Sequence, residues 1–126
     1  MPQTDLTAVV EDRGTTRTIS LEGALDEESA PTVDGLLVAA IADADVETVV
    51  VDLEGVSSID SSGVAVLLGL HAHSAQADTR LVMLPAPPTV QRTLALCGVV
   101  ERLPFATLSS EAEVFSGLGA SRSGTR

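Results

Sequence analysis

The stretch that decides the fold is residues 49–68, VVVDLEGVSSIDSSGVAVLL. It opens with a hydrophobic, β-branched run, which predicts a buried strand. It closes with an apolar run rich in leucine and alanine, which predicts a helix. Between them lies a polar segment, residues 60–63, that would place the hydroxyls of Ser61 and Ser62 at a helix N-terminus, where backbone N–H groups are unpaired. These two serines are therefore the first candidates for function.

The composition fits one soluble α/β domain. The chain has 126 residues, of which 44% are hydrophobic but only 2% aromatic, so its core must be built from valine, leucine, alanine and isoleucine. The formal net charge of −11 argues against binding to nucleic acid or to an anionic membrane surface. It suits either simple solubility or a partner with a basic face. We expect a single domain over residues 1–118 and a flexible polar tail over residues 119–126.

Other features of the sequence bear on the compartment. Cys97 is the one cysteine, so no intrachain disulfide can form, which fits a reducing compartment. The N-terminus lacks the basic and apolar regions of a signal peptide. No apolar run approaches the roughly 20 residues that a membrane-spanning helix needs. We therefore expect a cytoplasmic protein that is not in the membrane.

The remaining sequence predicts alternating strands and helices. A hairpin is indicated by two strands around a turn at residues 12–14. The expected strands are residues 6–11, 16–22, 46–53 and 79–84, with a short edge strand at 102–105. The expected helices start near residues 27, 62, 87 and 110, with Pro31 in the first turn of the first one. This order predicts a mixed, largely parallel sheet of four or five strands with about four helices.

Catalytic and metal sites find little support. A serine nucleophile needs a base within hydrogen-bond reach, but His71 lies ten residues beyond Ser61 on the same predicted helix, roughly 15 Å away. His71 and His73 are two residues apart, so on a helix they point in different directions and do not form a ligand pair. No glycine-rich phosphate loop is present. We expect no catalytic residue, cofactor or metal, and the serines could still be ordinary helix-capping residues.

Several motifs in register point beyond helix capping. Residues 21–26, LEGALD, are similar to an L-x-G-x-L-D element, and residues 59–64, IDSSGV, resemble a D-S-[ST]-G-[LV] phosphorylation motif. Residues 90–98, VQRTLALCG, resemble a helix of the pattern V-x-R-x-[LF]…G. Together with the buried strand before Asp60, these motifs resemble the STAS domain of the bacterial anti-sigma factor antagonist family over residues 6–118.

The resemblance implies a protein that switches partners. The unmodified antagonist would bind an anti-sigma factor, which is a serine kinase, and so release a sigma factor. The kinase would phosphorylate Ser61, and a PP2C-type phosphatase would reverse this. The partner-binding surface would include Asp26, Asp60, Ser62 and Gly63. A STAS accessory subunit of a membrane transport complex is the alternative, which the intact serine motif disfavours.

A phosphate on Ser61 would add about −1.5 to −2 charges at neutral pH. At a helix N-terminus the backbone can receive such a group, while Asp60, and Asp26 at the end of another strand, would repel it. We therefore expect the switch to block an interface rather than to change the fold. On the helix that follows, the spacing predicts a half-buried His71, and Leu70 is a candidate exposed contact for the partner.

Overall fold

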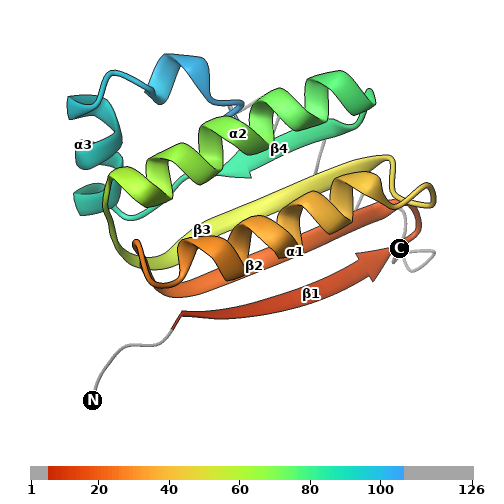
Figure 1. Ribbon diagram of the computed structural model, residues 1–126, viewed down its shortest axis with the longest axis horizontal. Coiled ribbons are helices and arrows are strands. Elements are labelled where there is room, and N and C mark those ends of the chain that lie inside the picture. The colour runs from red at the N-terminus through yellow and green to blue at the C-terminus, as the bar shows by residue number, and fades with distance from the viewer. Residues whose placement is uncertain (1–5, 107–126) are drawn as a thin grey trace, which may run out of the picture.

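Four strands, three α-helices and one 3-10 turn make up residues 6–106, the part of the chain that this computed structural model describes (Figure 1). In chain order they are β1 (Thr7–Arg13), β2 (Thr16–Leu25), α1 (Ala30–Ala42), β3 (Thr48–Ile59), α2 (Ser61–Ala77), β4 (Arg80–Leu84), α3 (Pro88–Leu96) and the 3-10 turn (Val100–Arg102). The sheet has the order β1-β2-β3-β4, in which β1 pairs antiparallel with β2 and the other pairs are parallel. The predicted α/β fold with a mixed, largely parallel sheet is thus confirmed.

Helices α1 and α2 lie side by side across one face of the sheet (Figure 1). The main core fills the space between this helix layer and the sheet. Ile19 of β2, Val51 of β3 and Met83 of β4 point into this core and have no exposed surface. Leu37 of α1 and Leu67 of α2 meet them from the helices and are equally buried. Full burial of each such side chain is worth about 1.5–3 kcal/mol, so this layer supplies most of the stability.

The first part of β3, its run of valines at residues 49–51, is buried on both faces, as the sequence predicts. Val49 and Val51 point toward the helices, while Val50 lies on the other face and is 1% exposed. There Val50 packs with Val82 in a second, smaller cluster, alongside Leu84 and Ala106. A central strand with a continuous hydrophobic run is what such two-sided burial requires.

The length of β3 differs from the prediction. The strand ends at Ile59 rather than at residue 53, because it stays paired with β2 as far as Leu25. Two register shifts let this half of β3 follow β2 despite its glycine and serines. A Cβ on Gly55 would lie 2.5 Å from Cγ of Glu22 and 2.9 Å from the carbonyl oxygen of Leu21, so the close approach of the two strands depends on this glycine. As a result, β2 and β3 end level with each other.

Two other boundaries also differ. Helix α1 begins at Ala30, with Pro31 in its first turn as predicted, but Glu27 and Glu28 belong to the preceding turn. The predicted edge strand at residues 102–105 is reduced to one bridge between Phe105 and Met83, which follows the 3-10 turn. The predicted helix at 110–118, the domain boundary at residue 118 and the tail at 119–126 lie outside the described residues.

The buried face of α2 is rotated from the predicted one. Leu70 is 1% exposed and belongs to the core, so its proposed role as an exposed partner contact is wrong. His71 is exposed instead of half-buried. The reason is the packing of Gly63 against β2, which points Gly63, Leu67, Leu70 and Ser74 toward the sheet at spacings of four, three and four. None of the helices in residues 6–106 is long and apolar enough to cross a membrane.

Candidate functional site

The polar segment at residues 60–63 lies at the carboxyl end of β3, where α2 begins at Ser61. Because β2 runs parallel to β3 and ends at the same level, the turn at residues 26–29 lies beside it. In open α/β sheets, the carboxyl ends of neighbouring parallel strands are where functional loops gather. The structure therefore brings Asp26 and Asp60 together, although they are 34 positions apart in the chain.

Asp60 is the N-cap of α2. Its Oδ1 atom accepts hydrogen bonds from the backbone N–H groups of Ser62 at 2.9 Å and Gly63 at 3.2 Å. Its Oδ2 atom accepts one from the N–H of Glu27 at 3.2 Å, in the neighbouring turn. Asp60 therefore satisfies the end of α2 and ties it to the turn that precedes α1.

Asp26 organises the start of α1 in a similar way. Its Oδ1 atom accepts from the N–H groups of Glu28 and Ser29, each at 3.1 Å. The Ser29 hydroxyl donates to the carbonyl of Ala24 at 2.8 Å and accepts from the N–H of Asp26 at 3.0 Å. Sequence reasoning missed Ser29, although an aspartate followed by a serine three residues later is a recognisable turn signal.

Together these turns form an acidic rim around an open hollow of about 460 Å³, lined by Asp26, Glu27, Glu28 and Asp60. None of these four carboxylates forms an ion pair within the described residues. Since four negative charges are gathered here, the rim favours a basic partner surface.

Ser61 is the first residue of α2 and is exposed. Its hydroxyl has no hydrogen-bond partner in the part of the chain that the structure describes. The nearby amides of Ser62 and Gly63 are already bonded to Asp60, so they are not free to receive a phosphate as the sequence suggested. A phosphate on Ser61 would instead project toward solvent beside the acidic rim.

Gly63 has a steric role. A Cβ at this position would lie 2.5 Å from the carbonyl oxygen of Leu25, 2.7 Å from Cγ1 of Ile59 and 2.9 Å from Cγ of Leu25. Only glycine therefore lets the first turn of α2 pack directly on the end of β2. Ser62 beside it is half-buried, and its N–H is bonded to Asp60.

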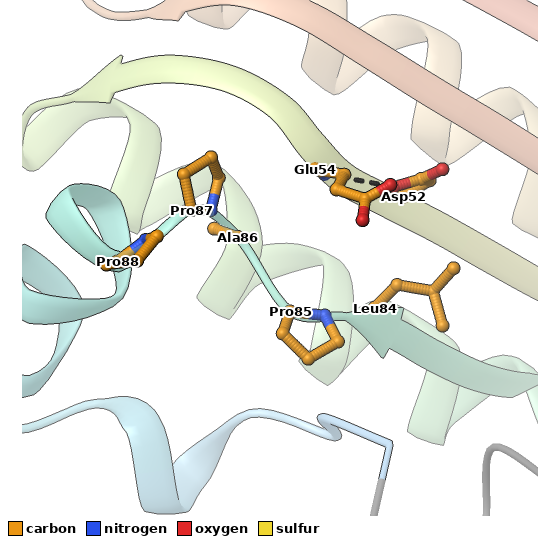
Figure 2. A pocket seen from close by; sticks show the side chains of 7 residues that line it. All are labelled: Asp52, Glu54, Leu84, Pro85, Ala86, Pro87 and Pro88. Carbon is orange, nitrogen blue, oxygen red and sulfur yellow. Dashed lines mark hydrogen bonds between the residues drawn. The ribbon is translucent and has the colours of Figure 1, made fainter.

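A larger hollow, of about 520 Å³, lies where β3 and β4 meet the loop leading to α3 (Figure 2). It is lined by the carboxylates Asp52 and Glu54 and by Leu84, Pro85, Ala86, Pro87 and Pro88. Asp52 accepts a hydrogen bond from the N–H of Glu54 at 2.9 Å. Apart from these two carboxylates its lining is apolar and holds no histidine, serine, cysteine or cation, so we take the rim beside Ser61 as the functional site.

Neither histidine of the chain lies where it could act as a base for Ser61. His71 stands on the same helix, ten residues further on, at a distance of roughly 15 Å. His73 places Nδ1 at 3.1 Å from the carbonyl oxygen of Gly69, one turn back on its own helix. No group of three or more histidine, cysteine, aspartate or glutamate side chains within residues 6–106 is arranged to hold a metal ion.

Comparison with known proteins agrees with this geometry. Residues 7–112 match the model of the STAS domain. An anti-sigma F factor antagonist from Lysinibacillus sphaericus is 32% identical over 81 residues, which cover 64% of this chain and 69% of that protein. The chain belongs to the STAS family of anti-sigma factor antagonists. Members of this family are regulators rather than enzymes.

Solved structures share the fold of this chain. The unphosphorylated anti-sigma factor antagonist SpoIIAA superposes with a TM-score of 0.69 and 26% identity, covering 88% of this chain and 97% of that one. An anti-sigma factor antagonist from Mycobacterium paratuberculosis gives a TM-score of 0.74 at 23% identity, covering 90% and 94%. SpoIIAA is also known in a phosphorylated form. The anion transporter Slc26a9 shares the fold alone, at 15% identity over 18% of its own chain.

Proposed function

We propose that this antagonist binds an anti-sigma factor through the acidic rim beside Ser61, and that phosphorylation of Ser61 ends that binding. The anti-sigma factor is a serine kinase in this proposal, and its capture by the unmodified protein releases a sigma factor. A PP2C-type phosphatase removes the phosphate, and the cycle takes place in the cytoplasm.

The observation that carries the proposal is the state of the Ser61 hydroxyl. It is exposed, it has no hydrogen-bond partner within the described residues, and it sits on a helix end that Asp60 already caps. A kinase can therefore reach the hydroxyl without breaking a bond on which the fold depends. Ser29 in the neighbouring turn is the opposite case, because its hydroxyl is fully used.

The switch follows from charge. The rim already holds four carboxylates, and a phosphate would add about −1.5 to −2 charges at its edge. Because the amides of Ser62 and Gly63 are occupied, the phosphate stays on the surface that a partner must cover. A group of this size and charge, buried without a matching cation, would cost several kcal/mol in an interface.

The other predicted residues have distinct parts in the proposal. Asp26 and Asp60 hold the two turns in position and present part of the negative surface to the partner. Ser62 lies half-buried next to the phosphate acceptor, within reach of a partner at the rim. Gly63 is buried and contributes indirectly, since it sets the position of α2 against β2.

Phosphosite mapping tests the assignment. The full chain is incubated with its cognate kinase and ATP, and the modified residue is located by fragment mass spectrometry. We expect phosphate on Ser61, and phosphate on Ser62 or any other residue would contradict the proposal. Ser61→Ala should remove the modification completely.

Binding measurements test the switch. By calorimetry with the anti-sigma factor, Ser61→Ala should bind within roughly threefold of the natural chain, and Ser61→Asp should bind roughly 100-fold more weakly. Gln76→Glu is the matched control, because it adds one negative charge at the exposed far end of the same helix. Equal weakening by both acidic variants would show that total charge matters and position does not.

A further inference from the structure

Strand β1 is an outer strand of the sheet, and no other strand of residues 6–106 pairs with its outer edge. The other outer strand, β4, is flanked by the chain that follows α3. The N–H of Met83 donates to the carbonyl of Pro104, and the N–H of Ala106 donates to the carbonyl of Met83, each at 2.9 Å. Within the described residues β1 has β2 on one side and no strand on the other (Figure 1). An open edge of this kind presents unpaired N–H and C=O groups to any extended strand.

The middle of this strand exposes two apolar side chains. Val9 is 64% exposed and Val10 is 45% exposed, and they point to opposite faces of the sheet. Leu96 on α3 is the only other large hydrophobic side chain in residues 6–106 with comparable exposure. In strand addition the main-chain hydrogen bonds along the edge give affinity, and Val9 and Val10 offer an added strand one apolar side chain on each face.

The two acids of β1, Glu11 and Asp12, are offset by Arg13 and by Arg17 of β2, in contrast to the rim beside Ser61. Arg13 pairs with Glu11 at 2.6 Å, and Arg17 pairs with Asp12 at 2.8 Å and with Asp43 at 3.1 Å. The rim beside Ser61 has four carboxylates without any such pairing in the described chain. Two copies of a chain with a net charge of −11 would therefore meet less repulsion at their β1 edges than at their acidic rims.

We propose that β1 is a self-association edge, at which a second copy of this chain adds its own β1 in antiparallel orientation. A two-fold axis at Val9 would place Val9 against its own copy on one face and Val10 against Ala8 on the other. The uncharged residues 7–10 of each β1 strand then lie at the centre of the strand pair. The two sheets become one sheet, in which β3 of one copy runs opposite to β3 of the other. The two Ser61 surfaces consequently lie at opposite ends of the dimer, free for partners.

The oligomeric state in solution tests this proposal. Sedimentation velocity on the full chain from about 5 µM to 500 µM should show a concentration-dependent dimer. The double variant Val9→Lys plus Val10→Lys should weaken the dimer by roughly tenfold or more, because every change is repeated across the two-fold axis and lysine protects strand edges. Both side chains are exposed, so thermal unfolding followed by circular dichroism should change little.

Leu96→Lys is the matched control, since it replaces an exposed apolar side chain elsewhere with the same charge. It should leave the dimer unchanged. A natural chain that stays monomeric throughout this range would overturn the proposal and leave the edge to a strand from another protein. A dimer weakened by Leu96→Lys and not by the double valine variant would overturn it as well, by placing the contact on α3.

Discussion

Two helices start side by side at the carboxyl end of this sheet, and each start carries an aspartate and a serine that are used differently. Before α1, the Ser29 hydroxyl is held in the turn by the carbonyl of Ala24 and the N–H of Asp26. At the start of α2, Asp60 satisfies the helix end, and the Ser61 hydroxyl has no partner within the described residues. The difference shows how a serine at a helix start can be held by the fold in one place and left exposed in another.

The largest effect should come from the glycine that brings the two helix starts together. Gly63→Ala places a Cβ within 2.9 Å of three atoms, one of them a backbone oxygen, so α2 must move away from β2. We expect a loss of about 3 kcal/mol in the free energy of unfolding, measured in urea.

Gly35→Ala on α1 is the control for Gly63→Ala. A Cβ on Gly35 meets nothing within 4 Å, so alanine should stabilise the helix by up to about 1 kcal/mol. If both substitutions had the same effect, the close packing of α2 on β2 would not be the cause.

Removing the aspartate cap of α2 should have the next largest effect. Asp60→Ala leaves the N–H groups of Ser62, Gly63 and Glu27 without their shared acceptor. We expect a loss of about 1–2 kcal/mol in urea unfolding. Asp45→Ala, which also removes one exposed carboxylate, should stay within about 0.5 kcal/mol of the natural chain. Equal losses would mean that net charge, and not capping, is responsible.

The two serines give the sharpest test of the comparison. Ser29→Ala should lower the free energy of unfolding by about 1 kcal/mol, because the N–H of Asp26 and the carbonyl of Ala24 lose a part-buried partner. Ser61→Ala should change it by less than about 0.5 kcal/mol, since its hydroxyl is exposed and unpartnered within residues 6–106. A larger loss for Ser61→Ala than for Ser29→Ala would reverse the assigned roles.

The smallest effect on stability should come from the phosphate mimic. Ser61→Asp adds a negative charge that the N-terminus of α2 attracts and Asp60 repels, so the unfolding free energy should stay within about 0.5 kcal/mol. Circular dichroism should be unchanged as well. A substantial loss of structure would contradict the proposal that phosphorylation acts at the surface and not through the fold.

Much of this architecture could be read from the sequence. Residues 49–53 and 64–68 carry the local hydrophobic patterns that distinguish a doubly buried strand from a helix, and such patterns depend on neighbours within a few positions. The motifs around Asp26 and Asp60 likewise identified the family before any contact was known. The end of β3 was not predictable, because serines and a glycine are weak strand formers unless a partner strand holds them.

What the sequence by itself determined, then, is the order of strands and helices and the candidate serine, since periodicity and motif spacing are local properties. Only the tertiary structure decided that, within residues 6–106, the Ser29 hydroxyl is hydrogen-bonded and the Ser61 hydroxyl is not. The bond from Glu27 to Asp60 joins residues 33 positions apart, and the contact of Gly63 with Leu25 sets which face of α2 is buried. Because such contacts form only when β2 and β3 pair, they decided that Leu70 is core, that His71 is exposed and that Ser61 faces the solvent beside four carboxylates.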